Sequence, residues 1–149
     1  MQNEYRYVTT ARFTTARRGV VAGAGGAQEL EFSSPPEFQG ESGFWTPEQM
    51  LVGAAAACFV ATFRAIAEFS KFEFLSLEVA TEGVLSKGEG GYRFTQVFVR
   101  PVLTIARESD RERALRLLEK AERGCLISRS LQAQISLEPA IKVTAAAQV

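Results

Sequence analysis

The hydrophobic and polar positions of this chain follow two periods, one typical of strands and one typical of helices. Runs that alternate between apolar and polar residues predict β-strands, and segments rich in glycine, proline or serine predict the loops between them. The loops are expected over residues 22–26, 33–43 and 87–91, the last being a hairpin turn. The strands are expected over residues 1–15, 20–21, 30–32, 74–85, 92–105 and 135–143, with an interruption at Pro139.

The strongest local signal is the start of a helix at Thr46. Thr46 fits the N-cap, Pro47 fits the first helical position, and Gln49 completes a capping box with Thr46. Fourteen uncharged residues, MLVGAAAACFVATF, then run up to Arg64. This run is shorter than the roughly 20 apolar residues that cross a membrane. Its alanine and glycine content instead predicts a buried helix packed on several sides, with a core shared between two subunits.

A second helix is expected after Ser109 or Asp110, one of which caps it, and it reaches about Arg123. Gly124 suits its end. Its apolar face comprises Ala114, Leu117, Leu118 and Ala121. The order of elements, β-β-β-α-β-β-α-β, predicts a single α+β domain over residues 1–149 with mostly antiparallel sheet.

Composition narrows the functional classes. The chain has 149 residues, of which 46% are hydrophobic and 23% charged, as expected for a folded domain. Lys+Arg and Asp+Glu balance at 17 each, which argues against a nucleic-acid partner. The N-terminus lacks an apolar secretory segment, so we expect a cytoplasmic protein with no membrane partner. With no histidine and two cysteines, the sequence offers neither a histidine-based nucleophile nor a zinc site, and we expect no metal or cofactor.

The two cysteines are the candidate chemical groups. Cys58 lies within the first predicted helix, and Cys125 directly follows the second. Four residues beyond Ala121, Cys125 continues the apolar face of the second helix, so both thiols are expected to point inward. Two small core residues would explain this arrangement, and so would a redox pair in a reducing compartment. Cysteine positions alone leave both explanations open.

The residues around the cysteines favour the redox pair. The segment TPEQMLVGAAAAC, ending at Cys58, closely resembles the signature helix of the OsmC/Ohr superfamily, a Pro-Glu pair followed by an alanine-rich stretch and Ala-Cys. The segment GCLISRSL around Cys125 resembles the second motif of that superfamily. One departure is Leu126, where a proline commonly follows the cysteine. The resemblance implies an OsmC-like fold with a long buried central helix, and an intertwined homodimer with active sites at the subunit interface.

The resemblance also implies roles for individual residues. Cys58 would be the peroxidatic thiol, Cys125 the resolving thiol and Glu48 the acidic partner. Arg17 aligns best with the arginine of the site, with Arg18 a close second. Chemically, a guanidinium offsets the rise in thiol pKa that burial causes, and a carboxylate can hold the guanidinium fork. Without the resemblance, Glu48 would simply complement the helix dipole, and the arginines would be solvated charges.

Glu48 raises a question of geometry. It precedes Cys58 by ten positions (58 − 48), which is about 15 Å on a continuous helix. No side-chain pair bridges this distance. The two residues therefore share a site only if the helix breaks or if Glu48 comes from the other subunit. Antiparallel packing of two such helices would allow the second arrangement.

The expected activity is that of a thiol-dependent peroxidase reducing hydroperoxides through a Cys58 sulfenic acid and a Cys58–Cys125 disulfide. Its reductant would be a lipoyl protein or a small thiol. Aromatic residues near the motif favour an organic hydroperoxide: Phe44, Trp45, Phe59 and Phe63. Two alternatives remain, a dimer of the same fold that binds a small apolar ligand, and a thiol sensor without turnover.

Overall fold

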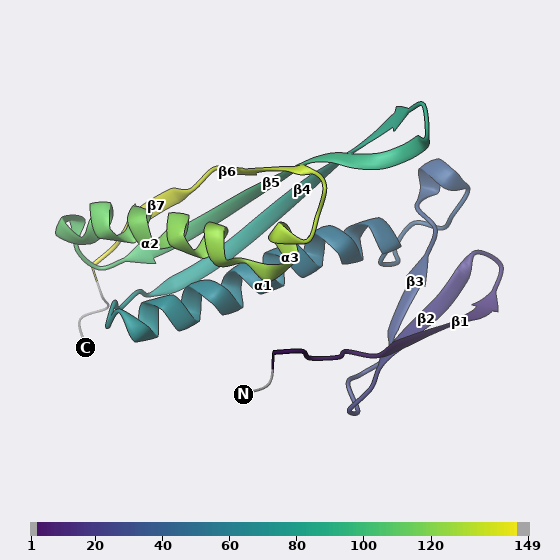
Figure 1. The fold of residues 1–149 in the computed structure, drawn as a ribbon, viewed down its shortest axis with the longest axis horizontal. Coiled ribbons are helices and arrows are strands. Elements are labelled where there is room, and N and C mark those ends of the chain that lie inside the picture. Colours follow the sequence, from purple (N-terminus) through teal and green to yellow (C-terminus); the bar gives the residue numbers. More distant parts are fainter. Residues whose placement is uncertain (1–2, 146–149) are drawn as a thin grey trace. The chain divides into compact units, whose positions relative to one another are not determined.

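A computed structural model describes residues 3–145 of the chain. The chain forms two compact units, Met1–Leu51 and Val52–Val149, whose elements are drawn in Figure 1. The expectation of one domain over residues 1–149 stays a prediction.

The first unit contains a three-stranded antiparallel sheet. Its strands are β1 (Thr9–Thr15), β2 (Arg18–Gly23) and β3 (Leu30–Ser33), with β2 in the centre. Gly19 is required there, because an added Cβ would lie 2.6 Å from the backbone oxygen of Arg12. The strand predicted over residues 1–15 begins only at Thr9; residues 3–8 are not in a strand, and residues 1–2 lie outside the described part. The predicted loop contains one turn of 3-10 helix, η1 (Pro36–Phe38).

The long helix α1 (Pro47–Phe69) begins where the sequence predicts. The capping box is confirmed, because the Gln49 N–H donates to Thr46 Oγ1 at 3.0 Å and the Thr46 N–H donates to Gln49 Oε1 at 3.2 Å. Burial on several sides, which we expected together with a core shared between two subunits, stays a prediction, because the structure describes one chain. One face is buried, while Leu51 and Val60 on other faces are exposed. The buried face comprises Ala55, Phe59, Phe63 and Ala67.

At 23 residues, α1 is long and apolar enough to cross a membrane by length and composition alone. The uncharged run that we counted in the sequence is shorter because Arg64 interrupts it. In this fold, the buried face of α1 belongs to the hydrophobic core of the second unit. We therefore interpret α1 as a core helix.

The sheet of the second unit is mixed. Strands β4 (Ser76–Gly88) and β5 (Gly91–Ile105) form the predicted antiparallel hairpin, whose turn ends at Gly91 with φ +102°. The predicted last strand divides at Pro139 into β6 (Gln134–Leu137) and β7 (Ala140–Val143). Both halves pair with β5 in parallel, whereas the pairings of β1 with β2, β2 with β3 and β4 with β5 are antiparallel, as expected. The chain returns through a helix after β5, and such a crossover places the next strand parallel to the previous one.

Helix α2 (Arg111–Gly124) follows a 3-10 turn, η2 (Glu108–Asp110), and precedes the short helix α3 (Leu126–Arg129). Asp110 occupies the N-cap position without a capping hydrogen bond; its carboxylate accepts a bond from Arg107 Nε at 3.1 Å. Gly124 is the last residue of α2. The predicted end of the helix is therefore confirmed. The chain leaves α2 through the extended backbone of Cys125, and Gly124 itself does not adopt the left-handed conformation common for a glycine at a helix end.

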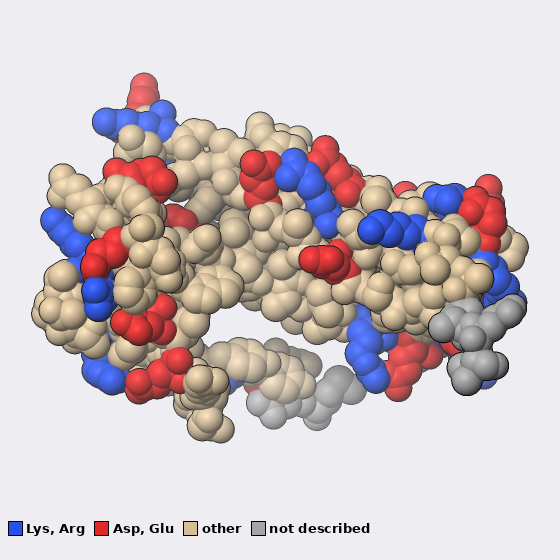
Figure 2. Space-filling view, turned by 180° about the vertical axis from the view of Figure 1, so that it is seen from behind, with Lys and Arg blue, Asp and Glu red and all other residues tan. Residues whose placement is uncertain are grey.

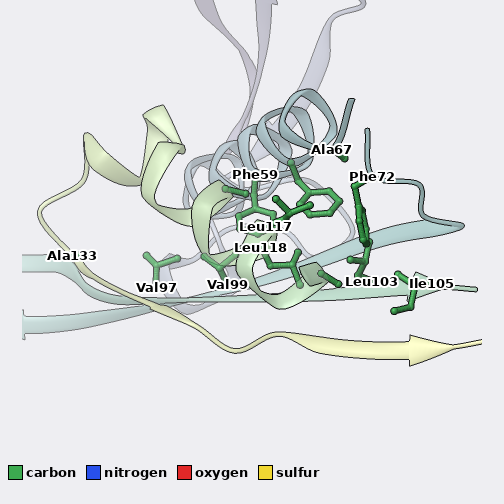
Figure 3. Packing of buried hydrophobic residues seen from close by; sticks show 13 residues of the cluster. Phe59, Ala67, Phe72, Val97, Val99, Leu103, Ile105, Leu117, Leu118 and Ala133 are labelled. Atoms are coloured by element: carbon green, nitrogen blue, oxygen red, sulfur yellow. The ribbon is translucent and has the colours of Figure 1, made fainter. Parts of the chain in front are cut away.

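The hydrophobic core joins α1 and α2 to one face of β5. Figure 3 shows Phe59 of α1 and Leu117 and Leu118 of α2 packed above Val97, Val99, Leu103 and Ile105 of β5. Full burial of a large apolar side chain stabilises the folded chain by about 1.5–3 kcal/mol. This packing fixes the end of α2, where Cys125 lies, relative to the part of α1 that carries Cys58.

The surface drawn in Figure 2 carries interspersed acidic and basic side chains. Neither charge dominates the described residues visible in that view. This pattern agrees with the formal net charge of zero.

Candidate thiol site

The two cysteines converge from different elements, and both are free thiols. Cys58 lies on α1 and is partly buried, whereas Cys125 is fully buried at the N-cap of α3. The Cys125 thiol donates to the carbonyl oxygen of Ala55 at 3.9 Å. Ala55 precedes Cys58 by three positions on α1, so Cys125 points at the turn of helix that carries Cys58. The inward orientation expected for Cys125 is confirmed, although its backbone does not continue α2.

The sulfur of Cys58 is surrounded by hydrogen-bond donors. Partial burial raises the pKa of the Cys58 thiol, but four hydrogen bonds favour the anion and leave the pKa below its ordinary value. These bonds involve the Ile127 N–H, the Cys125 thiol, the Thr62 hydroxyl and the Leu126 N–H. The contact between Thr62 Oγ1 and Cys58 Sγ measures 3.8 Å. Among the described residues, the groups that lower the pKa of Cys58 are therefore all uncharged.

The two backbone donors belong to the first turn of α3. Leu126 and Ile127 are its first residues, whose N–H groups have no acceptor within the helix. Cys125 has extended backbone, with φ −69° and ψ 112°, and turns the chain at this point. A proline at position 126 would have no N–H to give. The departure from the family motif that we noted at Leu126 therefore adds a donor to the thiol, a consequence that sequence reasoning missed.

The two candidate arginines belong to the first unit and differ in how firmly they are held. Arg17 is exposed, and its Nη2 donates to Gln39 Oε1 at 3.1 Å. Arg18 is half-buried and donates through Nε and Nη2 to both carboxylate oxygens of Glu41, at 2.6 and 2.8 Å. This pairing raises the pKa of Arg18 and lowers the pKa of Glu41.

The guanidinium of Arg18 also lies over the ring of Phe44, 4.7 Å from the centroid. A bidentate bond and an aromatic face together fix a guanidinium in one orientation. Arg18 is therefore the more firmly held of the two arginines, although Arg17 aligns better with the family motif.

Glu48 lies in the first turn of α1 and is partly buried. Its Oε1 is buried and has no hydrogen-bond partner in the described part of the chain. Between residues 3 and 145, no hydrogen bond or ion pair joins it to Arg17 or Arg18. A buried carboxylate oxygen without a donor is costly, so this atom needs a donor that the described residues do not supply.

Helix α1 is unbroken between Glu48 and Cys58, which removes one of the two arrangements left open by the sequence. Of the four predicted site residues, the structure brings Cys58 and Cys125 together. The catalytic roles of Cys58, Cys125, Glu48 and Arg17 stay predictions. Besides Leu126 and Ile127, Thr62 is the contact that sequence reasoning missed.

Comparisons with known proteins agree with this fold. The chain is 33% identical over 109 residues to the uncharacterised protein YmaD of Bacillus subtilis, covering 71% of this chain and 73% of that protein. It is 27% identical over 105 residues to peroxiredoxin OsmC of Escherichia coli, covering 70% and 72% of the two chains.

Among solved structures, an organic hydroperoxide resistance protein OsmC from Legionella pneumophila superposes with a TM-score of 0.76. The two chains are 24% identical, and the match covers 95% of this chain and 100% of the other, so it shows a shared fold. The family model of OsmC-like proteins matches residues 40–140, a span that contains both cysteines. The chain belongs to the OsmC-like protein family.

Proposed function

We propose that this protein is a thiol-dependent peroxidase that reduces organic hydroperoxides through Cys58. The observation that carries the proposal is the convergence of two thiols: Cys58 is partly buried on α1, and the fully buried Cys125 directs its thiol at the Ala55 carbonyl on the same turn of that helix. Hydrogen-bond donors near the Cys58 sulfur, Thr62 among them, lower the pKa of this thiol. A thiolate is the form that attacks peroxides, and such donors favour it. Two similar proteins support the activity by their names, peroxiredoxin OsmC and organic hydroperoxide resistance protein.

In the proposed reaction, the Cys58 thiolate attacks the terminal oxygen of ROOH. An S–O bond forms as the O–O bond breaks, and the leaving alkoxide takes up a proton to give ROH. The peroxide is reduced by two electrons, and Cys58 is oxidised to a sulfenic acid. Cys125 then attacks the Cys58 sulfur, so that an S–S bond forms and the sulfenic oxygen leaves as water.

Two thiols from a lipoyl protein or a small thiol would reduce the disulfide again, becoming oxidised in turn. A reducing compartment such as the cytoplasm would keep the resting protein in the dithiol form.

We also propose that the protein is a homodimer in which Glu48 serves the Cys58 of the other subunit. The buried, unpaired Oε1 of Glu48 supports a partner that supplies a donor, for which Arg17 and Arg18 are the candidates. The unpartnered apolar surface of α1 supports a helix–helix interface, and its small residues permit close approach. Exposed residues of this surface include Leu51, Ala54, Ala57, Val60 and Ala61.

The preference for organic substrates rests on fewer aromatic residues than we expected from the sequence. Phe59 and Phe63 are core residues, 1% and 0% exposed. Phe44 and Trp45 line a shallow hollow of about 250 Å³ in the first unit, together with Gly43 and Gln49. These two rings are the remaining basis for proposing an organic hydroperoxide rather than hydrogen peroxide as the substrate.

The test is a thiol count before and after one equivalent of cumene hydroperoxide. We expect the wild type to lose both thiols, and to lose them more slowly with one equivalent of hydrogen peroxide. Cys58→Ser should keep its remaining thiol, because Cys125 is fully buried. Two free thiols per wild-type chain after the pulse would contradict the proposal.

A second candidate function is binding of a small apolar ligand without turnover. One observation favours it, a cleft of about 460 Å³ in the second unit whose apolar walls include Phe72, Phe74 and Leu75. A binding protein needs no reactive thiol. It would keep both thiols through the peroxide pulse while quenching or enhancing an apolar fluorescent probe.

A further inference from the structure

Thr62 lies one helical turn beyond Cys58 on α1, with its side chain directed at the site. Its Oγ1 is 3.8 Å from Cys58 Sγ. On the other side, its Cγ2 methyl faces Gly124 at the end of α2, where an added Cβ would lie 3.6 Å from that methyl. The methyl thus packs against the end of α2, and the hydroxyl is presented to the sulfur.

This arrangement departs from the usual behaviour of threonine in a helix. A threonine hydroxyl commonly bonds the carbonyl oxygen three or four residues earlier. Across the described residues, the Cys58 sulfur is instead the partner of this hydroxyl. Since a thiolate carries no proton, the hydroxyl must donate once Cys58 ionises.

We propose that Thr62 is a catalytic residue whose hydroxyl donates to the Cys58 thiolate, keeping the sulfur ionised and oriented until it reacts. The proposal rests on the proposed function only for the identity of the electrophile. Stabilisation of the thiolate applies equally to any reagent that attacks through sulfur. This role agrees with the pKa of Cys58, which lies below its ordinary value in part because of the hydrogen bond with the Thr62 hydroxyl.

The test compares Thr62→Val with Thr62→Ser in monobromobimane alkylation measured against pH. Valine keeps the shape of threonine and loses the donor, whereas serine keeps the hydroxyl. We expect Thr62→Val to raise the apparent pKa of Cys58 by about 0.5–1 unit, which reduces the alkylation rate about 3- to 10-fold at pH values below both pKa values. Thr62→Ser should stay close to the wild type.

The high-pH plateau separates this role from a structural one. A thiol of higher pKa is intrinsically the stronger nucleophile, so Thr62→Val should equal or exceed the wild-type rate once both thiols are ionised. Thr81→Val is the matched control, because the Thr81 hydroxyl donates to the Val52 carbonyl of α1 at 2.9 Å and not to a sulfur. This control should leave the pH profile unchanged.

Two results would overturn the proposal: a wild-type profile in Thr62→Val, or equal slowing of Thr62→Val and Thr62→Ser at every pH including the plateau. Peroxide consumption is measured on the same samples. If the wild type leaves the peroxide intact, the proposed peroxidase function fails, while the alkylation profiles still decide the role of Thr62.

Discussion

Replacing Leu126 with proline removes one backbone donor from Cys58 and leaves the other donors in place. The fold should tolerate the change for three reasons. Position 126 is the first residue of α3, where proline is favoured. Cys125 already has the extended backbone that precedes a proline, and the Leu126 side chain is 68% exposed.

The expected rise in the pKa of Cys58 depends on how many hydrogen-bond donors remain near its sulfur. A hydrogen bond to a charged group contributes about 1.5–3 kcal/mol in a buried setting. Cys58 is only partly buried, and three other hydrogen bonds remain. We therefore expect the pKa of Cys58 to rise by about 0.5–1 unit, equivalent to about 0.7–1.4 kcal/mol. The higher pKa leaves less thiolate near neutral pH, so peroxide consumption and alkylation should slow there by about 3- to 10-fold.

The assay is alkylation against pH for Leu126→Pro and for Leu126→Ala as the control. Alanine removes the same side chain and keeps the N–H, so Leu126→Ala should follow the wild-type profile. Thermal melting of both variants checks that the fold is intact. Identical pH profiles in the two variants would refute the idea that this N–H stabilises the thiolate.

Three further predictions concern the arginines, the helix cap and the dimer. Arg18→Ala should raise the pKa of Cys58 more than Arg17→Ala does, because the guanidinium of Arg18 is held by a bidentate carboxylate; equal alkylation profiles would argue against this. Thr46→Ala should lower the free energy of unfolding by about 1 kcal/mol in urea denaturation, since it removes the cap of α1, whereas Thr46→Ser should retain most of it. The wild type should sediment as a dimer at micromolar concentration and Val60→Asp as a monomer, because a charge would enter the proposed interface; a monomeric wild type would contradict the dimer.

Local signals in the sequence predicted the elements that local interactions determine. The capping box of Thr46 and Gln49 placed the start of α1 correctly, because its hydrogen bonds involve neighbouring residues only. The glycines between residues 87 and 91 placed the hairpin of β4 and β5 for the same reason. Strand pairing depends on distant segments, so the parallel partners of β5 were not predicted.

The sequence also could not predict which faces of α1 are covered within the chain, or which backbone groups contact Cys58. The uncharged run of α1 reveals that many faces are apolar, but composition does not say whether its own chain or a second subunit covers each one. The thiol site depends on backbone N–H groups of Leu126 and Ile127, which every residue except proline carries. The missing proline at position 126 was the one sequence signal for them. Thr62 could have been found from its spacing of four positions after Cys58 on a predicted helix.

The proposed peroxidase function depends on Cys58 and Cys125 forming a catalytic redox pair within one chain. The decisive experiment is peptide mapping under non-reducing conditions, after one equivalent of cumene hydroperoxide. We expect a single disulfide linking the peptides of Cys58 and Cys125, at unchanged subunit mass on a denaturing gel. In Cys125→Ser, oxidation should stop at a Cys58 sulfenic acid, which excess peroxide oxidises further. Two free thiols after the pulse, or a disulfide only between chains, would show that the two cysteines are not such a pair.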